Sequence, residues 1–173
     1  LPDGSQKELP EGANAHDLAM SISEGLARNV VAAKINDELR DVHIPLKNGD
    51  SVTLLKKDDP ESILVMRHSA AHIMAQAVQN LFPQAKTGTG PNVEHGFYYD
   101  FDIPDHQLTP DDLEKIETEM KRIIKEKQKF QRRQITDVDG TINAWHDKGD
   151  TYKAEILEKY NIAQKKLAKT TKI

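Results

Sequence analysis

Two histidines four positions apart, His68 and His72, are the residues of this chain whose spacing best suits chemistry. Four residues make about one helical turn, so both imidazoles would lie on one face of a helix. Imidazole exchanges protons near neutral pH, which suits hydrogen bonding or acid–base work on a polar substrate. Zinc binding is the competing chemistry, but the zinc motif has glutamate after its first histidine and needs a third ligand. Here Ser69 follows His68 and the chain has no cysteine, so a complete zinc site is not expected.

The element that must position this pair is a helix predicted over residues 61–81, ending before Pro83. At about 100° per residue, its apolar residues cluster on a side away from the histidines, which argues against buried structural histidines. These residues are Ile63, Met66, Ala70, Ile73, Met74 and Ala77. From spacing alone, two surface histidines remain the simplest interpretation.

The composition is that of a globular protein, with 37% hydrophobic and 30% charged residues in 173. A formal net charge of −4 argues against a broad basic surface for nucleic acid, although a local pocket for an RNA end needs only a few cations. No apolar run approaches the roughly 20 residues that span a bilayer. The absence of cysteine excludes disulfides, and a cytoplasmic location without membrane contact is expected.

Residues 1–57 predict a small ubiquitin-like β-grasp domain. The Asp3-Gly4 turn favours an N-terminal hairpin, and Asn14 can cap a helix that runs to about residue 23. A β-branched run at 30–35 and an alternating run at 51–55 predict strands. The helix should turn three apolar side chains inward, namely Leu18, Ala19 and Ile22.

Residues 58–173 predict a second, α+β domain after a charged segment that ends at Pro60. In it the long helix with the two histidines would pack on an antiparallel sheet. Thr109 and Pro110 mark the start of another helix, and a short helix is expected near Trp145. Three strands are predicted, over residues 96–101, 130–135 and 152–157.

Five sequence segments, in order, resemble the N-terminal region of the threonyl-tRNA synthetase family. The run RHSAAH at residues 67–72 is similar to the R-H-S-x-A-H signature of the family's editing domain. Together the segments cover about residues 1–158. The others are LPDGS at 1–5, which resembles the opening of the TGS domain, Gly90-Pro91 followed by GFYYD at 96–100, the acidic helix DDLEKIE at 111–117, and Tyr152-Lys153 followed by Ile156-Leu157.

The resemblance implies a TGS domain followed by an editing domain that hydrolyses serine mischarged onto threonine tRNA. It implies that His68, His72 and Lys153 are catalytic and that Tyr99, with both histidines, binds the substrate at the tRNA 3′ end. Without the resemblance, the residue pattern predicts that Tyr99 packs in the core and that Lys153 is a solvent-exposed lysine on a strand. No metal or cofactor is expected in this chain; the family's ATP and zinc belong to an aminoacylation domain. The full-length ligase is expected to be a homodimer through domains outside this sequence.

The resemblance ends near Lys159, before the family segment whose cysteine and histidine complete the pocket. The second domain is therefore expected to be truncated. One alternative is a catalytically incomplete tRNA-binding or regulatory module of the same fold. Another is a GTPase or stress-response enzyme that shares the TGS unit, but the chain has no G-x-x-x-x-G-K-[ST] loop, which counts against it.

Overall fold

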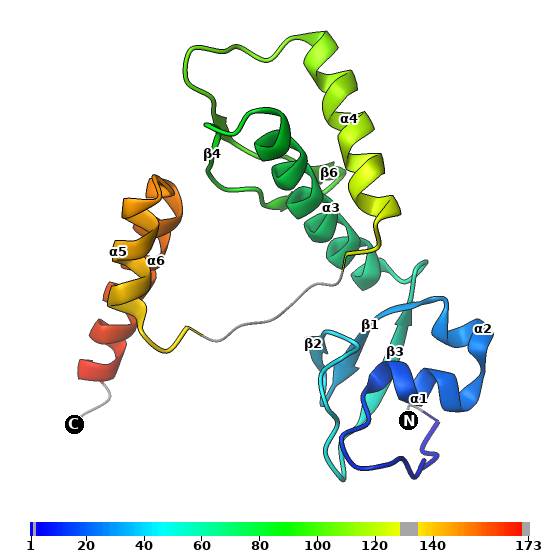
Figure 1. The fold of residues 1–173 in the computed structure, drawn as a ribbon. Helices are drawn as coiled ribbons and strands as arrows, with labels where there is room; N and C mark the ends of the chain where they lie inside the picture. The colour runs from blue at the N-terminus through cyan, green and yellow to red at the C-terminus, as the bar shows by residue number, and fades with distance from the viewer. Residues whose placement is uncertain (2, 129–134, 171–173) are drawn as a thin grey trace. The chain divides into compact units, whose positions relative to one another are not determined.

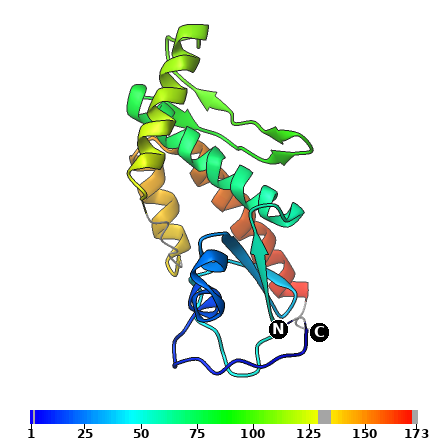
Figure 2. The same ribbon diagram turned by 90° about the vertical axis from the view of Figure 1, so that its right-hand side faces the viewer.

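A computed structural model describes residues 1, 3–128 and 135–170, with side chains up to residue 164. The chain divides into two compact units, Leu1–Ser69 and Ala70–Ile173, and the division falls within one long helix. Figures 1 and 2 show the helices and strands of both units as a ribbon. The predicted boundary after residue 57 precedes this helix and stays a prediction.

The first unit is a three-stranded antiparallel sheet covered by two helices. The strand order is β2-β1-β3, and β1 pairs with both neighbours. The β1–β2 turn places Asn36 and Asp37 at φ of 53° and 65°, the left-handed geometry of a tight hairpin. The elements are α1 (Ala15–Ile22), α2 (Glu24–Ala27), β1 (Val30–Ile35), β2 (Glu38–Arg40) and β3 (Val52–Lys56).

Helix α1 begins where the sequence predicts it. The Asn14 side chain accepts hydrogen bonds from the backbone N–H groups of His16 and Asp17, and the Asp17 carboxylate accepts from the Asn14 N–H. This reciprocal cap satisfies N–H groups that have no partner within the helix. The helix buries Leu18 and Ala19 in the core cluster, but Ile22 is 44% exposed, so its predicted inward position is wrong.

The N-terminal segment does not form the predicted hairpin of two strands. The Asp3-Gly4 turn is present, closed by a 2.9 Å bond from the Gly4 N–H to the Leu1 carbonyl. Residues 5–10 continue without regular structure. A turn signal fixes a local reversal, whereas strands also need a partner ladder, and here the segment has none among the described residues.

Helix α3 (Pro60–Leu81) carries both histidines, as predicted. Its buried side in the second unit is lined by small residues, since Ala71, Ala75 and Val78 are almost completely buried. The predicted apolar side is only partly correct, because Ile63 and Met66 are each 38% exposed. Small side chains let neighbouring elements approach the helix closely, which is why alanines are among its most buried residues.

The segment after α3 forms one long hairpin with an interruption. Strand β4 (Lys86–Thr87) pairs with β7 (Phe101–Asp102), and β5 (Asn92–Val93) pairs with β6 (Gly96–Phe97). Between them the Gly88 N–H bonds the Asp100 carbonyl, and the Asp100 N–H bonds the Thr89 carbonyl. The strand predicted over 96–101 is therefore two short strands. Pro91 lacks the N–H that would continue the ladder, which explains the break.

Helix α4 (Pro110–Lys125) packs its apolar stripe onto α3 and the hairpin. Thr109 caps it and Pro110 occupies its first position, as the sequence predicts. One core cluster unites the two helices with β7 and the loops beside it. Its buried members are Ala77, Val78, Ala85, Ile116 and Ile123, with Ile73, Met74, Phe82, Phe101, Ile103 and Met120 packed against them.

The chain ends in a helical hairpin, α5 (Val138–Asp147) and α6 (Thr151–Thr170). The helix near Trp145 is confirmed, but the strand predicted over 152–157 is wrong, because these residues open α6. Lysine, alanine, glutamate and leucine there favour helix. The less exposed positions Ala154, Leu157 and Asn161 are spaced by three or four residues, the helical period. The strand predicted over 130–135 falls largely on residues 129–134, outside the described residues.

Candidate functional site

His68 and His72 lie on one face of α3, and both are exposed. A helix rises about 1.5 Å per residue, so the Cα atoms of the two histidines are about 6 Å apart along its axis. The buried residues Ala71 and Ala75 lie beside them, roughly a quarter-turn or less away at 100° per residue. The prediction that neither histidine belongs to the core is confirmed. Two imidazoles in this position can contact a ligand that approaches from solvent.

Ser69, between the two histidines, forms a hydrogen bond within its own helix. Its hydroxyl donates to the Val65 carbonyl one turn earlier, over 2.9 Å. Such back-bonding is usual for serine in a helix and leaves the hydroxyl proton engaged. No arrangement of Ser69 with His68 and an acid is evident in the described contacts, so Ser69 is not assigned as a nucleophile.

Tyr99 packs against two residues of the hairpin. Its ring stacks on Phe101, with ring centroids 4.9 Å apart and planes 17° from parallel. The other neighbour is Gly90, where an added Cβ would overlap the Tyr99 ring. Glycine at residue 90 therefore allows the two strands to close around the ring. Tyr99 is half-buried, so it combines the packing role read from the pattern with a surface that a ligand can reach.

Lys153 lies in the first turn of α6 rather than on a strand. Its Nζ is 3.4 Å from Asp150 Oδ1, and its side chain remains 38% exposed. The preceding residue, Tyr152, donates its hydroxyl to Asp102 Oδ2 over 3.3 Å, linking α6 to β7. The Asp102 charge raises the pKa of Tyr152 above its usual value, so this hydroxyl remains a donor at neutral pH.

Two of the predicted site residues lie within one unit. Tyr99 and Lys153 belong to one unit, and the bond between Asp102 and Tyr152 ties the hairpin of one to the helix of the other. His68 and His72 share a helix face, but the chain's division into units falls between them. Assembly of all four side chains around one substrate stays a prediction.

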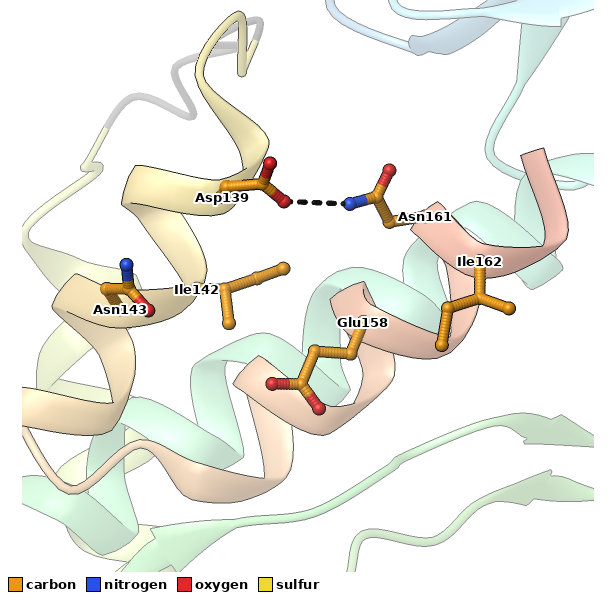
Figure 3. A pocket seen from close by; sticks show the side chains of 6 residues that line it. All are labelled: Asp139, Ile142, Asn143, Glu158, Asn161 and Ile162. Carbon is orange, nitrogen blue, oxygen red and sulfur yellow. Dashed lines mark hydrogen bonds between the residues drawn. The ribbon is translucent and has the colours of Figure 1, made fainter. Parts of the chain in front are cut away.

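Two hollows on the surface lie elsewhere. One, of about 290 Å³, lies between α5 and α6, where Ile142 points between the helices and Asn161 donates to Asp139 over 3.1 Å (Figure 3). The other, of about 800 Å³, is lined mainly by residues 5–13 and 46–50 of the first unit. Neither is lined by His68, His72, Tyr99 or Lys153, so these hollows are not the predicted site.

The strongest electrostatic feature of the described residues supports α4 rather than the site. The buried Asp112 carboxylate accepts from the Thr109 hydroxyl and backbone N–H, and Lys115 and His106 lie within 3.3 and 2.9 Å. The hydrogen bonds from Thr109, with smaller contributions from His106 and Lys115, hold the pKa of Asp112 well below its usual value. This carboxylate stays charged at neutral pH and fixes the start of α4.

A second ionic group joins α3 to α4. Glu119 accepts from Arg122 and from Asn80 of α3, each at 2.7 Å, and these bonds lower the pKa of Glu119 to about 2. In the described ranges, no group of three or more histidine, cysteine, aspartate or glutamate residues is arranged to hold a metal ion. None of the helices described is both long and apolar enough to cross a membrane.

Sequence reasoning missed two features that shape the candidate site. Tyr99 and Gly90 both belong to motifs quoted above, but no spacing rule predicts that they are in contact. The partnership of Asp102 and Tyr152 spans 50 residues and carries no local signal.

Comparison with known proteins shows which proteins this chain is similar to. A family model described as the TGS domain matches residues 1–56, which confirms the β-grasp prediction for the start of the chain. The threonine–tRNA ligase of Geobacter sp. (strain M21) is 49% identical over 158 residues, covering 91% of this chain and 24% of that protein. With the same coverage, those of Clostridioides difficile and Geobacillus kaustophilus are 45% and 42% identical over 157 residues. The chain spans about a quarter of the length of these relatives. It is thus similar to the N-terminal region of threonine–tRNA ligases and begins with a TGS domain.

Proposed function

We propose that this chain is the proofreading region of a threonyl-tRNA synthetase and removes serine mischarged onto threonine tRNA. The observation that carries the proposal is the pair of exposed imidazoles on one face of α3, within a sequence similar to threonine–tRNA ligases over 91% of its length. The partner is the 3′ end of the tRNA in the cytoplasm. ATP and zinc, and the surfaces of a homodimer, belong to parts of the ligase outside this sequence.

A separate hydrolytic site is needed because binding alone discriminates poorly between the two amino acids. Serine lacks one methyl group of threonine, and a missing methyl group is worth only about 1–3 kcal/mol in a pocket built for the larger side chain. An aminoacylation site therefore accepts serine too often. A second site can admit the smaller seryl group, exclude the threonyl methyl group, and cleave the ester that escaped the first selection.

The reaction is hydrolysis of the ester between serine and the terminal ribose. A water oxygen attacks the carbonyl carbon, the bond to the ribose oxygen breaks, and that oxygen leaves with a proton. Serine and the free tRNA hydroxyl are the products. His68 and His72 hold the terminal nucleotide and the attacking water, and an imidazole near neutral pH accepts and returns the proton. No covalent enzyme intermediate is required.

Tyr99 and Lys153, both in the second unit, are the other residues of the proposal. The half-buried phenol of Tyr99 forms a wall that the terminal nucleotide contacts, with Gly90 and Phe101 fixing the ring. The Lys153 ammonium is close to Asp150 but remains partly exposed, so it can polarise the ester carbonyl or contact a phosphate. Hydrogen bonds and a fixed positive charge near the developing oxyanion lower the barrier without further chemistry.

The test is deacylation by this chain of seryl-tRNA and threonyl-tRNA, both made on threonine tRNA. We expect hydrolysis of the seryl ester, little hydrolysis of the threonyl ester, and a loss of roughly 100-fold or more with His72→Ala. His95→Ala is the matched control, because His95 lies in the hairpin turn with 89% of its side chain exposed. Activity that survives both His68→Ala and His72→Ala would contradict the assignment.

A second candidate is a tRNA-binding module of the same fold without complete chemistry. The family's pocket includes a cysteine from a segment that the resemblance does not reach. If the chain binds a non-hydrolysable seryl-adenosine analogue at His68, His72 and Tyr99 but leaves seryl-tRNA intact, this second function holds and the hydrolase proposal fails for the chain alone. Hydrolysis at that site excludes the binding module.

A further inference from the structure

The hydrogen bond between Tyr152 and Asp102 joins the two elements of the second unit that carry predicted site residues. The Tyr152 hydroxyl donates to Asp102 Oδ2 over 3.3 Å. Tyr152 directly precedes Lys153 on α6, and Asp102 follows Tyr99 by three residues on the hairpin. A strand rises about 3.3 Å per residue, so Tyr99 is about 10 Å along the chain from this bond. The bond thus joins the neighbour of Lys153 to the hairpin strand that follows Tyr99.

Packing around the bond restricts how α6 can move. Ala154, next to Lys153, is completely buried, and α6 contacts β4, the partner strand of β7. Packing through alanine sets the distance between a helix and its neighbour, but it lets the helix slide or rotate. A directed hydrogen bond adds a preference for one register of the helix.

We infer that Tyr152 is a positioning residue of the proposed editing site. Its bond to Asp102 fixes the first turn of α6 against the β4–β7 pair and so sets where the Lys153 ammonium stands relative to the Tyr99 ring. Tyr152 does not touch the substrate, since its hydroxyl is committed to Asp102. The effect of Tyr152 on activity rests on the proposed function, whereas its effect on the position of α6 can be measured separately.

The geometric content is tested by spin labels in the whole chain. The sequence has no cysteine, so His95→Cys and Glu155→Cys place one label on the hairpin turn and one on α6 without background. Tyr152→Phe removes only the hydroxyl, and we expect it to broaden the distribution of label distances at least twofold. The matched pair His95→Cys and Lys86→Cys, within the hairpin, should not change. An unaltered distribution for the first pair in Tyr152→Phe overturns the inference.

The catalytic content is tested by seryl-tRNA deacylation. Tyr152→Phe should lower kcat roughly tenfold with little change in KM, since misplacing a reacting group acts mainly on the transition state. Asp102→Asn keeps an acceptor oxygen and should retain most of the activity that Asp102→Ala loses. In a Lys153→Ala chain, Tyr152→Phe should have no further effect.

The outcomes separate the two proposals. An inactive parent chain defeats the hydrolase proposal for this chain, and the spin-label result still decides whether Tyr152 positions α6. An active chain in which Tyr152→Phe is as fast as the parent overturns the inference alone. An equal loss in the presence and absence of Lys153 also overturns it, because Tyr152 would then not act through the lysine.

Discussion

The ring of Tyr99 lies against Gly90, so closely that a β-carbon at residue 90 would overlap it. This contact bridges the hairpin where the paired strands are interrupted. Glycine is required at residue 90 because a side chain would clash with the Tyr99 ring, and not because of an unusual backbone angle.

Gly90→Ala should therefore destabilise the chain and displace Tyr99. The added methyl group forces the ring or the backbone to move, and overpacking of this kind costs about 1–3 kcal/mol. Gly96→Ala is the matched control in the same hairpin, because open space surrounds that position. Urea denaturation of the two variants measures the difference. Equal stability would show that the ring yields without cost.

His68→Ala and His72→Ala should leave stability nearly unchanged. Both side chains are exposed, and surface substitutions away from caps and buried networks usually change the free energy of unfolding by less than about 0.5 kcal/mol. Thermal denaturation of each variant beside the parent chain checks this. A large loss of stability would mean that the histidines serve the fold, and any loss of activity could then not be credited to the site.

Stability should fall in acid through Asp112. Its pKa in the folded chain lies below the ordinary value of 3.8, so its charged form stabilises the fold above about pH 4. That contribution is lost as pH falls from 3.8 toward the lower folded value. Asp112→Asn should be less stable than the parent at pH 7 and should lose less stability between pH 4 and pH 2.5. Asp111→Asn, on the exposed side of the same turn, should keep the parent's dependence on pH.

Residues 1–57 should fold when expressed alone. The buried residues of the first unit's core cluster lie within residues 15–52, and a partly exposed ion pair of Lys34 with Glu61 links β1 to the start of α3. Cooperative unfolding of the fragment in urea tests this. Leu18→Ala removes a buried side chain and should cost about 2–5 kcal/mol, abolishing the transition. A fragment without any transition would move the domain boundary into α3.

Local chemistry in the sequence predicts most of the helices. Asn14 and Thr109 cap helices because their side chains accept from N–H groups within three residues, so the signal and the structure share one short segment. His68 and His72 are exposed as predicted, although the buried Ala71 and Ala75 lie beside them on the helix rather than opposite. Errors arise where local signals conflict, as at residues 152–157, where aromatic and branched side chains suggest a strand and the whole composition favours helix.

The remaining part of the candidate site depends on contacts between distant segments. Lys153 was assigned to the wrong element, and its neighbour Tyr152 meets Asp102 across 50 residues. The division of the predicted strand at 96–101 also depends on a partner, since Pro91 interrupts the opposite strand. Such pairings depend on tertiary packing, so the sequence pattern of either segment does not predict them.

The hairpin of β4 to β7 has a consequence for the order of folding. Its strand pairs join residues at most 16 positions apart, whereas α6 must reach back 50 residues to Asp102. Local pairs close quickly, and distant ones must first overcome the entropy of a long loop. During synthesis the hairpin can form before α6 has left the ribosome. We expect Tyr99 to be in place early and Lys153 to reach its position later.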